Sequence, residues 1–270
     1  MTRLYFILMV LGGLFSCDDE IPYDLKQPEA GQQKVLVEEI SGVRCPNCPD
    51  GSRLLEALNA DFDSSLVIVT YHAGSFSIPY KESRYDFKTD QTVALMEYLG
   101  RPIGYPSAAI QRIPLQDQST YQRFPNTWTT TISEVLNSEP GVDLNLSVDT
   151  LGSVVNLHLS ALFLRSVSAP VYLTAYLTES GLVDPQADTR AGDEHVPDYV
   201  HDHVLREVLT PVTGLLWGEG FQELDFREDS LRIDFESMPR VVDRSRTSFV
   251  VFLHSRSGVL QVEKIETYPR

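Results

Sequence analysis

Hydrophobic and polar residues follow two different periods along this chain. Up to about residue 140, continuous apolar runs at 35–40 and 66–71 predict buried strands, and the segments between them repeat apolar residues at helical spacing. The first helix should begin near Pro49, whose missing amide proton is harmless in a first turn. Its predicted apolar stripe consists of Leu54, Ala57, Leu58 and Phe62. Strands that alternate with helices favour an α/β sheet.

Two more helices are expected in this part of the chain. Asp90 is a candidate N-cap for a helix that ends at Gly100, and Asn126 is a candidate N-cap for another. Between these helices, residues 104–107 form a proline-containing loop that leads into a further strand. The α/β pattern therefore extends from residue 34 to residue 140.

From residue 141 the period changes to two, because apolar and polar residues alternate as they do in half-buried strands. The alternating stretches lie at 142–148, 155–161, 171–177, 231–235 and 249–253. Short strands separated by Gly, Pro, Asp and Ser are typical of an antiparallel sandwich. Residues 181–197 are rich in Asp, Gly and Pro and are predicted to form a long loop. Trp217 is assigned to the core. We therefore predict an all-β antiparallel sandwich domain at 141–270.

The N-terminus has the pattern of an export signal. Residues 1–17 contain a charged start, an apolar run too short to span a membrane, and a small residue before Cys17. The end of this segment resembles a bacterial lipobox, which implies that Cys17 is diacylated and anchors the protein to a membrane. The alternative is a plain secretory signal, whose cysteine is discarded or left free. Residues 18–33 are predicted to be a tether, and their acidic start resembles the export tag of surface lipoproteins in Bacteroidetes-type bacteria.

Composition and charge narrow the functional classes. The 270 residues are 42% hydrophobic and carry a formal net charge of -16. This acidic balance argues against binding to nucleic acid or to an anionic bilayer surface. After the signal, no apolar run approaches the roughly 20 residues of a membrane helix. The sequence has no nucleophile elbow, P-loop or GxGxxG motif, so hydrolase and nucleotide chemistry lack support and no cofactor is predicted.

The strongest chemical signal is the CxxC motif Cys45-Pro46-Asn47-Cys48, which lies between a predicted strand and a predicted helix. Two intervening residues, wound into a first helical turn, bring the two sulfurs within bonding distance and leave Cys45 exposed. The helix dipole and the neighbouring Arg44 favour a Cys45 thiolate. That thiolate can attack a partner disulfide, and Cys48 then resolves the mixed disulfide.

A carboxyl group near the motif could take part in proton transfer. Glu39, six residues before Cys45 in the predicted strand, is a candidate proton acceptor for Cys48. The simpler interpretation is that Glu38 or Glu39 faces solvent, and the sequence alone favours this simpler interpretation.

Part of the chain resembles a thioredoxin fold. The segments that carry this resemblance are 35–40, 45–49, 66–71 and 104–107. It implies that Pro106 is a cis proline opposite the cysteines and that Tyr105 and Pro106 bind substrate, with Pro102 as a competing candidate for the proline. Two features depart from the fold. Arg44 stands where thioredoxins carry tryptophan, and residues 113–125 show no clear hairpin strand.

A closer resemblance covers nearly the whole chain. Residues 38–49, 71–74 and 201–206 are similar to the Omp28-related outer-membrane lipoproteins of Bacteroidetes. That family joins a thioredoxin-like domain to a β-domain, so the expected fold is an α/β thioredoxin-like domain at 34–140 followed by the all-β antiparallel sandwich at 141–270. The resemblance also implies a lipid-anchored protein of the bacterial outer membrane, on its periplasmic face or at the cell surface. It is as compatible with surface binding as with redox work.

Three hypotheses follow for the CxxC motif. The leading one is thiol-disulfide exchange with the thiols or disulfides of exported proteins. The second is a non-catalytic surface-binding or adhesion lipoprotein, in which Cys45 and Cys48 form a structural disulfide and the partner is a surface protein. The third and weakest is copper binding by both cysteines and His72. No zinc site is predicted, because the chain has no second cysteine pair. His201 and His203, predicted on one face of a strand, fit a solvated edge better than a metal site.

Overall fold

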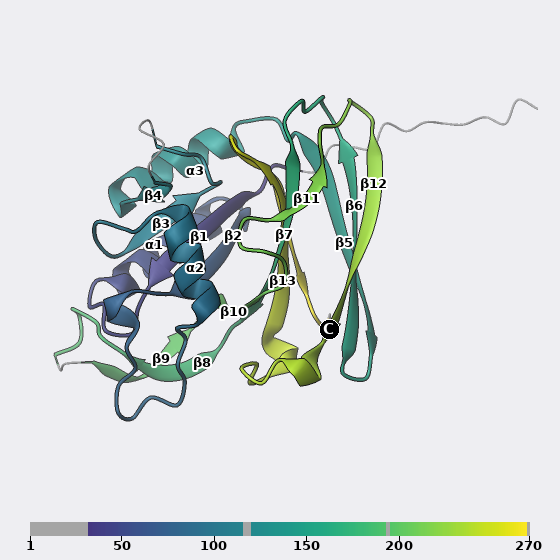
Figure 1. Ribbon diagram of the computed structural model, residues 1–270. Coiled ribbons are helices and arrows are strands. Elements are labelled where there is room, and N and C mark those ends of the chain that lie inside the picture. The colour runs from purple at the N-terminus through teal and green to yellow at the C-terminus, as the bar shows by residue number, and fades with distance from the viewer. Residues whose placement is uncertain (1–31, 116–119, 193–194, 269–270) are drawn as a thin grey trace, which may run out of the picture.

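The computed structural model describes residues 32–115, 120–192 and 195–268. Within these residues the chain forms a nine-stranded mixed sheet, a three-stranded antiparallel sheet and a two-stranded hairpin. The helices surround one end of the large sheet, and the small sheet packs against its other end (Figure 1). No helix of the described residues is long and apolar enough to cross a membrane.

The first half of the chain contributes four neighbouring strands to the large sheet. In spatial order they are β2 (Leu66–His72), β1 (Val35–Ser41), β3 (Ser107–Ile110) and β4 (Gln122–Arg123). The pair β1 and β2 is parallel, whereas β3 runs antiparallel to both β1 and β4. The short β4 lies where the sequence predicts no clear strand. Every residue of β1 and β2 is buried, and because side chains alternate along a strand, both faces must be covered.

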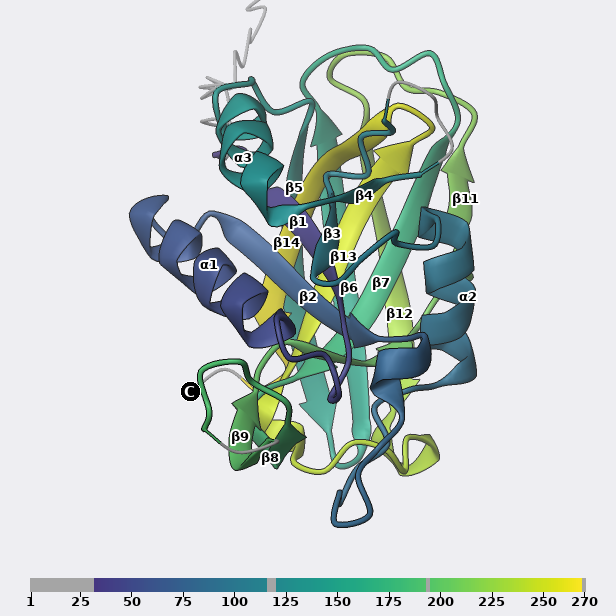
Figure 2. The same ribbon diagram turned by 90° about the vertical axis from the view of Figure 1, so that its left-hand side faces the viewer.

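Helices cover both faces of this end of the sheet (Figure 2). They are α1 (Cys48–Asp61), α2 (Asp90–Leu99) and α3 (Trp128–Leu136). The face of β1 that carries Val37 packs against α1 and α3, and the face that carries Ile40 packs against α2. The buried positions of α1 include Leu55 and Leu58, whereas Ala57 is exposed, so the predicted stripe is wrong at that position.

The helix caps also differ from the predicted ones. Thr89, rather than Asp90, caps α2, because the Thr89 hydroxyl accepts a hydrogen bond from the amide of Thr92. Asp90 instead lies in the first turn, where the positive end of the helix dipole stabilises its carboxylate. Asn126 lies in a short 3₁₀ turn and Thr127 precedes α3. The 3₁₀ turns of the described chain span Ser75–Ser77, Pro125–Thr127, Phe235–Ser237 and Arg244–Arg246.

The second half is built from antiparallel strands, and each of the five alternating stretches forms one. The strands are β5 (Val142–Leu151), β6 (Val154–Phe163), β7 (Val171–Glu179), β11 (Leu215–Gly218), β12 (Phe226–Asp234), β13 (Thr247–Ser255) and β14 (Gly258–Glu266). The small sheet has the order β12-β6-β5 and packs on β7, β11, β13 and β14. Their shared core includes Trp217, which is 2% exposed, as predicted.

The two halves share the large sheet. Strand β10 (Val204–Val208) lies between β2 and β7, parallel to the first and antiparallel to the second. The amide of Thr70 in β2 donates to the carbonyl of His203, just before β10. Residues of the second half therefore complete the sheet that the first half begins.

The segment predicted as a long loop contains a hairpin. Strands β8 (Leu182–Gln186) and β9 (Val196–His201) pair antiparallel. Asp184 and Gln186 are polar but almost fully buried, so composition misled the prediction. The predicted shared face of His201 and His203 is also wrong, because His201 ends β9 and His203 adopts a φ of +56° in the turn that follows.

A buried ion pair of the first half is hydrogen-bonded to a tyrosine of the second half. The guanidinium of Arg112, just after β3, donates to both carboxylate oxygens of Glu38 in β1, at 2.8 and 2.9 Å. The hydroxyl of Tyr176 in β7 donates to Glu38 at 2.8 Å and accepts from Arg112 at 2.6 Å. All three side chains are nearly inaccessible to solvent. Each charge depends on its partners, since a buried charge without a counter-charge is costly.

We expect Glu38→Gln to destabilise the protein by about 3–5 kcal/mol, because it leaves Arg112 charged and unpaired in the interior. Urea unfolding of the purified protein measures this loss. The control is Glu97→Gln, which breaks the exposed pair between Glu97 and Arg101 on α2 and should change stability little. A loss for Glu38→Gln no larger than that of the control would contradict this account of the buried ion pair.

Candidate functional site

The two cysteines of the CxxC motif form a disulfide at the start of α1. Their Cα atoms are 5.4 Å apart, Cys48 is the first residue of the helix, and Pro49 follows it. Unpaired amides and the helix dipole at this end favour negative charge on a nearby sulfur. Arg44, the residue before Cys45, makes its contacts with the loop that follows β2. Its guanidinium donates to the carbonyls of Ile78 and Pro79 and stacks on the ring of Tyr80.

The disulfide is buried, which corrects the expectation of an exposed Cys45. Cys45 and Cys48 are each 1% exposed. The end of β8 and the residues after it bind the loop that holds both cysteines. The side chain of Gln186 donates to the carbonyl of Cys45 at 3.0 Å, and the amide of Thr189 donates to the carbonyl of Pro46 at 2.9 Å. The sequence gives no sign of this contact, because the segment lies about 140 residues further along the chain.

Glu39 is fully buried beside the first turn of α1, so the prediction that Glu38 or Glu39 faces solvent is wrong for both. The hydroxyls of Thr70 and Ser52 donate to the Glu39 carboxyl group at about 3.2 Å. The Ser52 hydroxyl also lies 3.4 Å from the carbonyl oxygen of Cys48. Burial raises the pKa of Glu39 to about 8, although both hydrogen bonds favour its charged form. Glu39 is therefore largely protonated at neutral pH.

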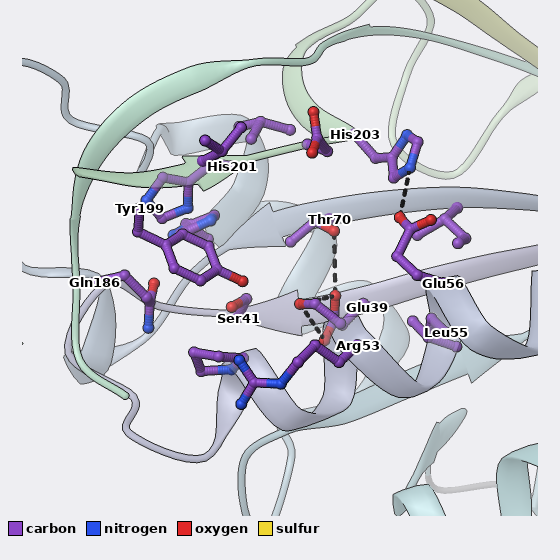
Figure 3. A pocket seen from close by; sticks show the side chains of 17 residues that line it. Glu39, Ser41, Arg53, Leu55, Glu56, Thr70, Gln186, Tyr199, His201 and His203 are labelled. Carbon is purple, nitrogen blue, oxygen red and sulfur yellow. Dashed lines mark hydrogen bonds and ion pairs between the residues drawn. The ribbon is translucent and has the colours of Figure 1, made fainter. Parts of the chain in front are cut away.

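A cavity of about 190 Å³ opens beside Glu39. Figure 3 shows Glu39 and Thr70 on one wall, on β1 and β2, and Tyr199 and His201 from β9 across from them. At one end of the cavity the His203 imidazole lies 3.0 Å from the carboxylate of Glu56 on α1, and this contact lowers the pKa of Glu56. The residues that line the cavity come from β1, β2, α1 and the β9–β10 turn.

Two buried histidines also border this cavity. His72 and His201 have ring centroids 5.7 Å apart, and each lies 4.9 Å from the ring of Phe87. Burial lowers the pKa of His201 to about 4 and that of His72 well below its usual range, so both rings are neutral at pH 7. In the part of the chain that the structure describes, no group of three or more His, Cys, Asp or Glu is arranged to hold a metal ion.

The loop before β3 packs against the turn that carries Cys48. The peptide bond between Tyr105 and Pro106 is cis. Pro106 lies so close to Gly51 in α1 that a Cβ at Gly51 would stand 2.8 Å from the proline ring. The Tyr105 hydroxyl donates to the carbonyl of Ala73 at 3.1 Å. The structure thus brings Glu39, Pro106 and the disulfide together, whereas Cys17 lies outside the described residues.

The raised pKa of Glu39 predicts a specific pH dependence of stability. Between about pH 5 and pH 8 the folded protein keeps a proton on Glu39 that the unfolded chain releases, so this residue makes the free energy of unfolding fall as pH rises. Glu39→Gln cannot lose that proton. We expect the stability of Glu39→Gln relative to wild type to rise across this window by up to about 1.4 kcal/mol per pH unit.

Urea unfolding at several pH values measures this difference, and Glu97→Gln serves as the exposed control. If the wild-type and Glu39→Gln stabilities run parallel from about pH 5 to pH 9, Glu39 is charged in the folded protein and its assignment as a protonated group is wrong.

Comparisons with known proteins agree with this architecture. Among solved structures, HBP35 of Porphyromonas gingivalis aligns with a TM-score of 0.62 and 16% identity, over 88% of this chain and 76% of that one. Protein AGR_C_4864 of Agrobacterium tumefaciens aligns with a TM-score of 0.53 and 10% identity, over 89% of this chain and 97% of that one. At such identities the likeness shows a shared fold. A comparison with functionally curated proteins gives no match.

The family is shown by the sequence itself. Residues 94–268, about two thirds of the chain, match the family model of outer membrane protein Omp28. The match begins after the CxxC motif and includes Tyr105, Pro106 and the segment that covers the disulfide. The chain therefore belongs to the Omp28 family and is a protein of the bacterial outer membrane.

Proposed function

We propose that this protein exchanges disulfides with exported proteins through Cys45 and Cys48. The observation that carries the proposal is the position of the disulfide in the first turn of α1, beside a buried carboxyl group with a pKa near neutrality. A helix N-terminus stabilises the thiolate that forms when the disulfide opens. A nearby protonated carboxyl group can then supply the proton that the leaving sulfur takes up.

The arrangement of the first half supports a thioredoxin-like domain at 34–140. The sheet contains a parallel β1–β2 pair, an antiparallel β3 next to β1 and a final antiparallel β4. The helix that begins at the CxxC motif packs on one face of this sheet, and the loop with the cis proline leads into β3. On this basis Tyr105 and Pro106 are the proposed contacts for substrate backbone. The sandwich at 141–270 then holds this domain through β10 and covers its active site.

The exchange reaction follows from the oxidised state in the structure. A partner thiolate attacks the Cys45 sulfur, the Cys45–Cys48 bond breaks, and the partner and Cys45 form a mixed disulfide. Cys48 leaves as a thiolate and takes the proton of Glu39. A second partner thiolate attacks the partner's own sulfur and releases Cys45, so the partner gains a disulfide and the Cys45–Cys48 pair gains two electrons. In the reverse direction the Glu39 carboxylate accepts the proton of Cys48.

The protein's place in the cell completes the proposal. Diacylation of Cys17, followed by the tether at 18–33, would anchor the folded part to the outer membrane. Exported proteins form their disulfides in the oxidising compartment that this membrane encloses. The anchored site would therefore meet partners whose cysteines are being oxidised or rearranged.

One observation favours a second function. Both cysteines are almost inaccessible in this state, and a disulfide that never opens would only fix the loop between β1 and α1. In that case the protein is a surface-binding lipoprotein, and the acidic chain presents its folded surface to a partner protein. The two functions differ in whether Cys45 ever bonds to another protein.

Cys48→Ser separates the two functions. Without the resolving sulfur, Cys45 should remain disulfide-bonded to envelope proteins. Non-reducing gels of cell extracts should then show high-mass adducts that disappear when dithiothreitol is added. Cys45→Ser and the double variant are matched controls that should show none. A folded Cys48→Ser protein that forms no adducts would contradict the exchange function and support the structural disulfide.

A further inference from the structure

The segment Gln186–Arg190, here called the covering segment, lies over the CxxC loop. It follows β8 and runs beside the N-terminal end of α1, where Figure 2 places the β8–β9 hairpin. The amides of Ala187 and Thr189 donate to the carbonyls of Val43 and Pro46, at 2.8 and 2.9 Å. The covering segment thus binds the CxxC loop through its main chain, as an added extended peptide would.

A side chain of the covering segment completes this contact. The amide nitrogen of Gln186 donates to the carbonyls of Gly42 and Cys45, at 3.2 and 3.0 Å. Gln186 itself is 2% exposed. The covering segment therefore binds carbonyls on both sides of Cys45, which is itself 1% exposed.

Charged pairs fix the covering segment to α1. Asp188 accepts two hydrogen bonds from the guanidinium of Arg53, at 2.9 and 3.4 Å, and Arg190 lies 2.7 Å from Asp50. Asp188 is 8% exposed, and the contact with Arg53 lowers its pKa. A fork-shaped guanidinium that holds both oxygens of one carboxylate is a specific recognition geometry for an acidic side chain.

We propose that the covering segment holds the place of a partner's peptide, and that Arg53 selects a partner that carries an acidic side chain near its reactive cysteine. The covering segment has no cysteine, so it occupies the site without reacting. A partner with an extended cysteine-containing stretch and a nearby Asp or Glu competes for the same carbonyls and the same guanidinium. This inference rests on the proposed exchange function and names the class of partner.

The first test is Asp188→Asn in the full chain, which removes the charge that Arg53 holds and preserves the shape of the side chain. We expect dithiothreitol to reduce the Cys45–Cys48 disulfide roughly three- to tenfold faster in this variant than in wild type, because the covering segment opens more often. Glu97→Gln, which breaks an ion pair on α2 away from the covering segment, should leave the rate unchanged. An unchanged rate in Asp188→Asn would overturn the proposal.

Hydrogen exchange distinguishes local opening from general loss of stability. In Asp188→Asn the amides of Ala187 and Thr189 should exchange faster, while those of the buried strand β1 keep their wild-type protection. If the amides of β1 accelerate equally, the variant unfolds as a whole and its faster reduction contradicts a local cover.

The second test measures the selection of partners. The probes are the peptides Gln-Cys-Asp-Thr-Arg and Gln-Ala-Asp-Cys-Arg, each with a twin in which asparagine replaces the aspartate. In Asp188→Asn at least one aspartate peptide should react with the disulfide several-fold faster than its twin. Adding Arg53→Gln should abolish that difference. Equal rates for both pairs of twins in Asp188→Asn would contradict the role of Arg53.

These outcomes are separable from those for the proposed function. If Asp188→Asn accelerates reduction and the aspartate peptides are preferred, but Cys48→Ser traps no envelope protein, the cover is real and the exchange function is wrong. If Cys48→Ser traps partners and Asp188→Asn changes nothing, the exchange function stands and the inference about the cover is wrong.

Discussion

Strand β1 is buried on both faces, and it carries two consecutive glutamates. Because neighbouring residues on a strand point to opposite faces, Glu38 and Glu39 enter two different interiors. Glu38 forms an ion pair with Arg112, and the hydroxyl of Tyr176 links this pair to β7. Glu39 meets only hydroxyl donors among its hydrogen-bond partners, so burial favours its protonated form. One burial constraint thus yields both a contact between the two halves and a protonated carboxyl group beside the first turn of α1.

The sequence was informative wherever a feature depends on neighbours along the chain. The apolar runs of β1 and β2, the CxxC motif at a helix start and the period-two strands after residue 141 all depend on local pattern. The covering segment could not be predicted in this way, because Gln186 contacts Cys45 across about 140 residues and lies in a stretch whose composition suggests a loop. Likewise, β10 enters the sheet beside β2 through a long-range contact. Two glutamates inside an apolar run were the available sign that buried acids lie near the motif.

The covered disulfide reconciles the two functions that the sequence leaves open. An exposed CxxC disulfide at a helix N-terminus would react with many thiols, and a disulfide that is never exposed would have only a structural role. Here the cover is held by main-chain hydrogen bonds, by the buried side-chain amide of Gln186, and by two ion pairs to α1, Arg53 with Asp188 and Asp50 with Arg190. Such contacts open at a modest cost compared with unfolding of the core. Under the exchange function that we propose, the cover keeps the disulfide closed until a matching partner replaces the covering segment.

The reduction potential of the Cys45–Cys48 pair tests the central claim most directly. It can be measured in a protein that lacks residues 1–17, by equilibration with glutathione and alkylation of free thiols. Our account predicts a pair that comes to equilibrium with glutathione and has a potential between about -120 and -270 mV, the range of dedicated oxidoreductases. A potential below roughly -300 mV without exchange would show that the disulfide is structural and would contradict the account.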